Sequence, residues 1–291
     1  MEQKIRPVQE ILRQQISKHS NSVAKKLLPS VRPIYRASDR DSPELIGSGV
    51  IIKVENYYFL ITAAHLLDQL RGLGMYIGGE KTVVDITGQL IIVATNSGSG
   101  DKDKIDFAFT EIPENLLDEL GRHNFLPPDE IDPNDIAIRE KRYLILGYPI
   151  SKNKWIDYKG LKVKPKSYPY SSRPSDILIY KELGISEESH LLLDFDKEKV
   201  TNGTGNVFIA PDLYGMSGGG VWTLHDDSKA LSIFSESQLN KLVGVIIEWD
   251  LQKKVIIAVR ISIVIAAIIE RYPNLIGKLP MPNRIRASIK S

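Results

Sequence analysis

The sequence contains no cysteine, so no disulfide can stabilise the fold, and packing and hydrogen bonds must do so alone. This composition is typical of a reducing compartment, and we expect a cytoplasmic protein. The amino terminus lacks the apolar core of a signal peptide. No apolar run is long enough to cross a bilayer, since the nearest one, residues 261–269, is bounded by Arg260 and Glu270. We therefore expect no membrane partner.

A strong excess of charge of one sign is also missing. The 291 residues include 38 Lys and Arg and 36 Asp and Glu, which gives a formal net charge of +2. A nucleic-acid-binding domain usually carries a basic excess on one face, so this balance does not favour nucleic acid as a partner. Residues 1–40 are locally basic. A solvated helix face is the simpler interpretation of that segment, and an acidic partner surface is the alternative.

Short segments rich in β-branched and aromatic residues dominate the chain after residue 30, separated by turn residues. Six of them precede an acidic, proline-containing connector over residues 111–140, and more follow it, including Ile177–Tyr180. Regular short strands of this kind are typical of a barrel or a sandwich. The pattern predicts an all-β fold in two strand-rich halves.

Helices are predicted at the two ends of this β region. Near Pro7 a helix begins whose apolar residues fall on one face and must pack against something, namely Ile5, Val8, Ile11, Leu12 and Ile16. Residues 262–272 form a second, mostly apolar helix. We therefore divide the chain into an arm with the first strand (1–44), a first half with the connector (45–140), a second half with the closing helix (141–272) and a tail (273–291).

Two motifs in the first half carry residues suited to proton transfer. An apolar strand runs through two alanines into His65, and these small residues leave the imidazole accessible. Asp106 stands at the entry of the next apolar strand, where a carboxylate is costly unless it is hydrogen-bonded, for example to an imidazole Nδ1 proton. A structural histidine and a solvated carboxylate are the alternatives. Asp101 and Asp103, in the preceding charged loop, are weaker candidates.

The third motif is LYGMSGGGVW, residues 213–222. An acyl-transfer nucleophile needs a hydroxyl held at a turn and backbone N–H groups aimed at the developing oxyanion, and glycine allows the required backbone shape. Ser217 would be the nucleophile, and the amides of Gly215 and Ser217 would form the oxyanion hole. A glycine-rich turn of a β-hairpin is the alternative interpretation.

The order His65, Asp106, Ser217 is that of the chymotrypsin triad and differs from the orders in other serine-hydrolase folds. The chain resembles the chymotrypsin-like (trypsin-like) serine peptidases over roughly residues 45–270, on the segments Gly49–Ile51, Thr62–His65, Asp106–Phe109, Gly215–Gly219 and Leu242–Ile246. The resemblance implies two packed, antiparallel six-stranded β-barrels. It also implies a protein or peptide substrate and no cofactor or metal, with His65 as general base and then acid, Asp106 orienting it, and Ser217 as nucleophile.

Met216 departs from the family pattern. Many members carry an aspartate immediately before the serine, which pairs with a new amino terminus after zymogen cleavage. Methionine cannot form that ion pair, so we expect no activation by trimming. In this respect the chain resembles the cysteine-free bacterial members, in which other contacts order the oxyanion loop.

The primary specificity pocket is less well defined. The position six places before the serine, which often lies at the base of the pocket in the family, is an uncharged proline. A tryptophan in the pocket strand comes one residue later than usual. An acidic pocket selecting Lys or Arg and a small apolar pocket both remain open, with the candidate residues Pro211, Asp212, Ile247, Glu248 and Trp249.

Together these features predict an intracellular serine endopeptidase that needs no zymogen cleavage. The alternative is a partner-gated or catalytically silent module, acting as an adaptor or sensor in a stress or defence pathway through a regulatory protein bound to the amino-terminal helix. No metal is expected, because His225 beside Asp226 and Asp227 matches no ligand spacing.

Overall fold

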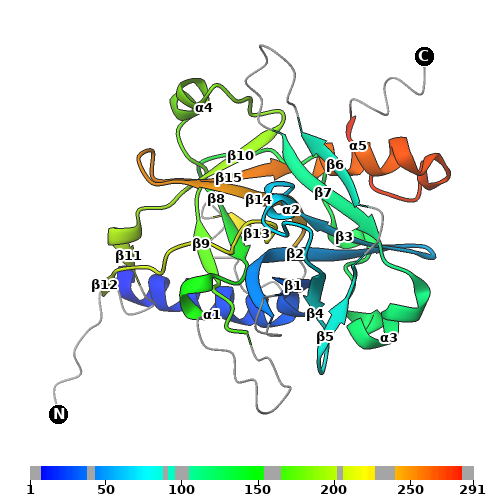
Figure 1. Cartoon of the computed structure of the whole chain (residues 1–291). Coiled ribbons are helices and arrows are strands. Elements are labelled where there is room, and N and C mark those ends of the chain that lie inside the picture. Colours follow the sequence, from blue (N-terminus) through cyan, green and yellow to red (C-terminus); the bar gives the residue numbers. More distant parts are fainter. Residues whose placement is uncertain are drawn as a thin grey trace.

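The computed structural model describes residues 8–37, 43–87, 91–95, 105–153, 165–201, 206–226 and 240–283. These residues form two antiparallel sheets packed against each other, a short hairpin, and helices at both ends of the chain (Figure 1). The prediction of a mostly β chain flanked by helices is confirmed. None of the described helices is long and apolar enough to span a bilayer.

The first sheet has the strand order β5-β4-β1-β2-β3-β7-β6 within the described residues. Its strands are β1 (Val31–Arg36), β2 (Glu44–Val54), β3 (Tyr57–Thr62), β4 (Met75–Gly78), β5 (Val83–Asp85), β6 (Ile91–Thr95) and β7 (Asp106–Glu111). This is one strand more than the six predicted. The additional strand is β4, whose short length and closing glycines Gly78 and Gly79 give it the appearance of a turn in the sequence.

The second sheet has the order β10-β15-β14-β13-β8-β9, and a two-stranded hairpin lies beside it. Its strands are β8 (Lys141–Leu146), β9 (Tyr170–Ser172), β10 (His190–Asp194), β13 (Gly220–Asp226), β14 (Leu242–Asp250) and β15 (Val255–Arg260), and the hairpin comprises β11 (Val200–Thr201) and β12 (Val207–Phe208). The segment after β9 pairs with β10, through Asp194 N–H to Arg173 O (3.0 Å) and Ser175 N–H to Leu192 O (2.9 Å). The second sheet therefore curls until its two edges meet.

Closed barrels in both halves are not established by these ladders. In the described part of the chain, β5 and β6 remain the edges of the first sheet. The two sheets nevertheless bury both of their faces. Along β3, Phe59 and Ile61 join a cluster shared by the two sheets, whereas Tyr58 and Leu60 join a cluster of the first sheet alone. Because each face is apolar, most of these strands appear in the sequence as continuous apolar runs.

The predicted strand Ile177–Tyr180 is wrong, because these residues begin the helix α4 (Ile177–Leu183). Asp176 caps its first turn by accepting a hydrogen bond from Leu178 N–H (2.9 Å). Gly184 ends it in the left-handed region, with φ of 68°. Two further predicted strands change: residues 206–211 contribute the two-residue β12, and most of residues 161–165 lie outside the described part.

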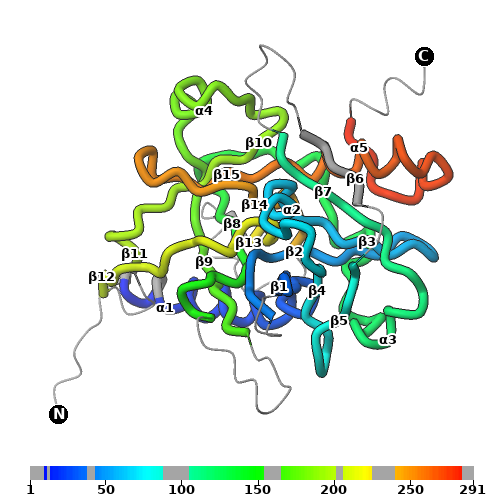
Figure 2. The backbone as a smooth tube through the Cα atoms, in the orientation of Figure 1, coloured from blue at the N-terminus to red at the C-terminus, as the bar shows by residue number. Residues whose placement is uncertain are grey.

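The amino-terminal helix α1 (Val8–Leu27) runs from the β11–β12 hairpin towards β1 (Figure 2). Its final turns carry the anchoring residues Val23, Ala24 and Leu27, which are buried in the shared cluster. Ile11, by contrast, is 42% exposed, so the predicted apolar face is not buried along its whole length. Ile5 of that face lies outside the described residues.

The other helices are short or packed at the periphery. α5 (Ile261–Arg271) lies against β14 and β15 and buries one apolar face in the shared cluster, as expected for the closing helix. α3 (Leu117–Leu120) belongs to the connector, and α2 (His65–Asp68) follows β3 directly. His65 thus stands where β3 ends and a helical turn begins.

Candidate active site

His65 and Asp106 form the best-defined polar pair of the site. The antiparallel pairing of β3 with β7 places Thr62 opposite Ala108, so the end of β3 lies beside the start of β7 at Asp106. One carboxylate oxygen of Asp106 lies 2.6 Å from His65 Nδ1, and the other accepts the backbone N–H of His65 at 2.9 Å. The carboxylate therefore holds both the ring and the backbone of the histidine. This arrangement leaves Nε2 available as a base.

Ser217 lies in a tight loop that leads into β13. Three backbone hydrogen bonds shape this loop: Met216 N–H to Leu213 O (2.8 Å), Gly219 N–H to Met216 O (2.8 Å) and Gly218 N–H to Ile246 O (2.7 Å). Gly215 and Gly218 have φ of 92° and 83°, a region that side chains disfavour. Within the described part of the chain, the amides of Gly215 and Ser217 have no acceptor. Two backbone donors on one loop can stabilise an oxyanion when both point at it.

The serine loop is fastened to the first sheet by Ser48 of β2, which is fully buried. Its hydroxyl donates to Gly215 O (2.7 Å) and accepts from Tyr148 N–H (2.9 Å). Its backbone N–H donates to Ser217 O at 2.8 Å, and its carbonyl accepts from Thr62 Oγ1 at 2.7 Å. Ser48 therefore connects both carbonyls that flank Met216 with the strand leading to His65.

Met216 is buried at 1% exposure in the cluster of the second sheet. Its side chain lies against Gly147, where an added Cβ would approach the sulfur to 3.0 Å. The side chain immediately before Ser217 is thus an apolar anchor of the loop. Met216 and the hydrogen bonds of Ser48 both anchor the serine loop.

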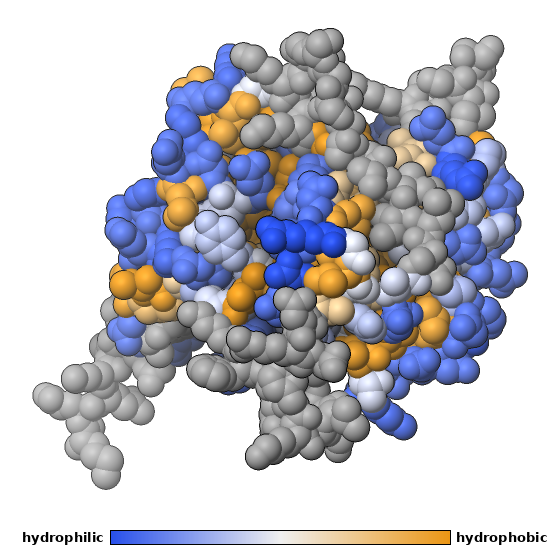
Figure 3. Space-filling model, viewed as in Figure 1, coloured by the Kyte–Doolittle hydropathy of each residue, from blue (hydrophilic) through white to orange (hydrophobic). Residues whose placement is uncertain are grey.

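The same loop reaches close to the histidine strand. A Cβ on Gly218 would lie 2.3 Å from Thr62 Oγ1, three residues before His65. The Ser217 hydroxyl, however, donates to Ile247 O at 3.4 Å instead of bonding to the imidazole. The hydrogen bond between a nucleophile and its base is often long in the absence of substrate. In Figure 1, α2 lies near the centre of the molecule, and hydrophobic and hydrophilic residues intermingle over this region (Figure 3).

The pocket beside Ser217 is small, about 10 Å³. Of the five candidates for its lining, Glu248 and Trp249 contribute, together with the apolar residues Ile145, Leu213, Met216, Ile246 and Ile256. The other three do not line it. Asp212 forms an ion pair with Lys197, and Ile247 is buried in the shared cluster while its carbonyl faces Ser217. A bulge in β14 between Ile246 and Glu248 accommodates the extra residue before Trp249.

The close contacts of Gly218 with Ser48 and Thr62 allow a test of how the serine loop packs against the first sheet. Alanine there would place its Cβ 1.9 Å from Ser48 O, in addition to the strain of a positive φ. Gly72 is a matched control, because it has φ of 79° and its added Cβ meets nothing within 4 Å. We expect Gly72→Ala to lower the free energy of unfolding by about 1 kcal/mol and Gly218→Ala by roughly 1–3 kcal/mol more. Urea denaturation measures both, and equal losses would contradict the close contact.

Sequence reasoning did not identify Ser48 as a residue of this site. The neighbouring glycines Gly47 and Gly49 could have indicated it, because a glycine within a strand often marks a place where another backbone segment or a ligand comes close. Asp101 and Asp103, the weaker carboxylate candidates, lie outside the described residues. Among those described, no three His, Asp or Glu side chains cluster as a metal would require.

A scan against protein-family models and a search of curated proteins both found no match to this chain.

Proposed function

We propose that this chain is a serine endopeptidase with the double-barrel fold of the chymotrypsin-like family. Ser217 forms the acyl-enzyme, His65 transfers the proton and Asp106 orients the imidazole. The observation that carries the proposal is the pair of hydrogen bonds between Asp106 and His65, which follows the strand that Ser48 links to the serine loop. Among the described residues, the amides of Gly215 and Ser217 in that loop have no acceptor. Each half also has its own apolar cluster besides the shared one, which supports two barrels packed together.

In the proposed reaction, Ser217 Oγ attacks the scissile carbonyl as His65 Nε2 takes its proton. The amides of Gly215 and Ser217 stabilise the oxyanion, and the imidazolium then protonates the leaving amine. Water hydrolyses the ester by the same base. Since Met216 and Ser48 already order the loop, the enzyme needs no zymogen cleavage. We place it in the cytoplasm, because a chain without cysteine forms no disulfides and can fold in a reducing compartment.

A fluorophosphonate probe tests the proposal directly, because it labels an activated serine covalently. We expect the wild type to be labelled and Ser217→Ala to be unreactive, with Ser151→Ala as a control that leaves labelling intact. Ser151 is a suitable control because its hydroxyl bonds to Asp212 O (3.2 Å) in the same half. Labelling that persists in Ser217→Ala would exclude Ser217 as the nucleophile.

The hydrogen bond from Ser217 Oγ to Ile247 O favours a second candidate, a protease gated by a partner or one that is catalytically silent. In that case the hydroxyl must rotate to the imidazole before it reacts. An unreactive but folded wild type would support this candidate over a constitutive enzyme. The exposed Ile11 on α1 is where such a regulatory protein would bind.

The size of the pocket beside Ser217 predicts the residue preferred before the cut. About 10 Å³ holds no more than one water-sized group, and most of its walls are apolar. We expect alanine, serine or glycine at this position to give the highest kcat/KM, at least tenfold above lysine or arginine. A peptide library analysed by mass spectrometry measures the preference. A preference for basic residues would show that Glu248 dominates the pocket.

A further inference from the structure

The β11–β12 hairpin presents three successive large apolar residues to solvent. Val207, Phe208 and Ile209 are 62%, 40% and 73% exposed. Among the exposed large apolar residues of the described part of the chain, no other three are consecutive. A single exposed apolar side chain needs no explanation, whereas a contiguous group often marks a surface at which another molecule binds.

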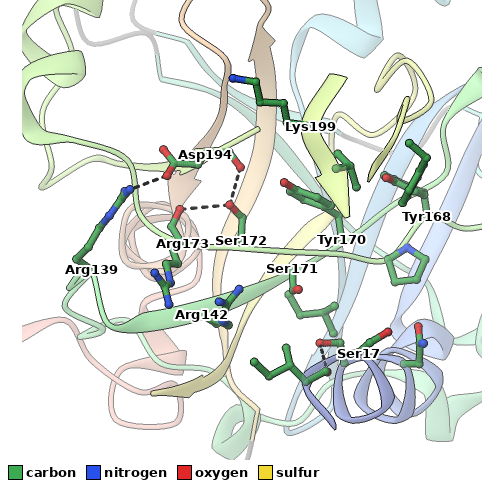
Figure 4. Close-up of a pocket in the computed structure, with 17 residues that line it drawn as sticks. Ser17, Arg139, Arg142, Tyr168, Tyr170, Ser171, Ser172, Arg173, Asp194 and Lys199 are labelled. Carbon is green, nitrogen blue, oxygen red and sulfur yellow. Dashed lines mark hydrogen bonds and ion pairs between the residues drawn. The ribbon is translucent and has the colours of Figure 1, made fainter. Parts of the chain in front are cut away.

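The side chains of this hairpin divide between two faces. Val200 pairs with Phe208 across the hairpin, and both line a cavity of about 570 Å³ between α1 and the second sheet (Figure 4). Because side chains alternate along a strand, Val207 and Ile209 point to the opposite face. Neither of them lines the cavity. The solvated face of an antiparallel pair is usually polar, but here two β-branched apolar residues occupy it.

The outer edge of β12 offers backbone groups as well. In the described part of the chain, β12 pairs only with β11, and residues 207–209 make no backbone hydrogen bond outside the hairpin. The end of β12 is nevertheless fixed, since Ala210 is buried and its N–H donates to Lys197 O at 2.9 Å. A fixed, extended edge with apolar side chains is a surface to which a further strand can add.

Size and position decide between the possible occupants of this edge. Three side chains offer much less than the roughly 800 Å² per partner that a stable dimer buries, so a second copy of this chain is not favoured. The edge is instead continuous with the proposed active site. Ile209 precedes Ser217 by eight residues, and in Figure 2 the chain runs from β12 at the edge of the molecule towards β13 near its centre. Eight residues span at most about 29 Å.

We propose that the outer edge of β12 binds an extended segment of the polypeptide substrate as a third strand of the hairpin. This inference rests on the proposed peptidase function. The bound segment pairs through its backbone and places side chains beside Val207 and Ile209, so it carries apolar residues at every second position. Folded proteins bury such segments, and unfolded ones expose them. The substrate class is therefore polypeptides with an accessible, extended apolar segment.

Binding to the Ser217→Ala variant tests docking without cleavage. The probe is a fluorescein-labelled peptide in which valine alternates with serine, with a lysine at each end for solubility. In the control peptide proline replaces each serine, which removes backbone donors that a new strand needs. By fluorescence anisotropy we expect a dissociation constant below about 0.2 mM for the probe and at least roughly tenfold weaker binding of the proline peptide. Equal affinities, or no binding of the probe, would overturn the proposal.

Two threonine variants locate the binding surface. Val207→Thr and Ile209→Thr keep a β-branched side chain and the strand preference but replace an apolar group with a hydroxyl. Each should weaken binding of the probe by about threefold to tenfold. Ile276→Thr is the matched control, because Ile276 is 46% exposed and follows α5, which lies opposite β12 in Figure 1. A loss of the same size in Ile276→Thr would show that the probe does not bind at β12.

Cleavage kinetics test whether the bound segment belongs to the substrate. The best short peptide from the library is compared with the same peptide joined to the probe, at either end, through a linker of about ten glycines and serines. We expect one of the extended peptides to have a KM about tenfold lower with an unchanged kcat, because docking stabilises the ground and transition states equally. The two threonine variants should remove this advantage and cleave the short peptide normally.

The two proposals fail in different ways. A wild type that the fluorophosphonate probe does not label would contradict the proposed function, while binding of the valine peptide is measured independently of it. A labelled wild type that cleaves both extended peptides with the KM of the short one would contradict the docking of substrate at β12.

Discussion

Replacing Asp106 by asparagine is expected to lower the rate of Ser217 acylation by about 10⁴-fold while leaving the fold intact. Asp106 accepts from both His65 Nδ1 and His65 N–H, at 2.6 and 2.9 Å. An asparagine can keep the backbone bond with its carbonyl oxygen. Its NH₂ group then faces Nδ1 as a donor, which leaves the ring proton on Nε2. The base nitrogen is thereby occupied, and Ser217 cannot transfer its proton.

The second-order rate constant for fluorophosphonate labelling measures this effect without knowledge of the natural substrate. Asp118→Asn provides the control, because Asp118 is a surface carboxylate, 84% exposed, paired with Arg122. We expect that variant to label at the wild-type rate. Thermal unfolding should show Asp106→Asn folded. A loss of less than tenfold in Asp106→Asn would mean that the carboxylate does not control the tautomer of His65, and the triad assignment would fail.

The strands were predictable because most of them lie between two apolar clusters. Such strands are marked by composition and length, and they need no alternating pattern. The same reasoning failed for Ile177–Tyr180, because four apolar residues fit a buried strand and a helix equally well. The deciding residues flank the run: Asp176 caps α4 and Gly184 ends it. Reading the caps before the apolar run would have corrected the prediction.

The candidate site was predictable where short motifs carry the chemistry and unpredictable where long-range contacts do. The motifs around His65, Asp106 and Ser217 each contain a residue of the proposed triad itself. Ser48, by contrast, bonds to groups 14, 100 and 167 residues away in the sequence. No local pattern specifies such partners, since only the packing of β2 against the serine loop brings them together. The lining of the pocket likewise includes Leu213 and Met216, which were not among the predicted residues.

Replacing Ser48 by alanine is expected to impair both stability and catalysis. The variant leaves Gly215 O and Tyr148 N–H without the hydroxyl that bonds them, at a position with no exposure. Each unsatisfied buried group costs about 1–3 kcal/mol, so the free energy of unfolding should fall by roughly 2–6 kcal/mol. The peptide group after Gly215 is then less restrained, and the oxyanion donors beside it lose their alignment.

The catalytic part of this effect should appear in kcat more than in KM, because the oxyanion contacts form in the transition state. Removing one oxyanion donor typically costs 10²–10³-fold. We expect roughly a tenfold to hundredfold loss in kcat for Ser48→Ala, since the donors are loosened and not removed. The readout is the kcat and KM of the best peptide from the library, measured well below the melting temperature.

Ser30→Ala is the matched control for this prediction. Ser30 is also a buried serine, 2% exposed, and its hydroxyl donates to Leu27 O at 2.7 Å and not to the serine loop. Both variants should lose stability, but Ser30→Ala should retain the wild-type kcat. Equal kcat values for the two variants would reduce Ser48 to a structural residue. A loss of kcat in Ser48→Ala alone would show that a buried serine of the first sheet aligns the proposed oxyanion hole in the second half. Ser48 would then replace the ion pair that Met216 cannot form.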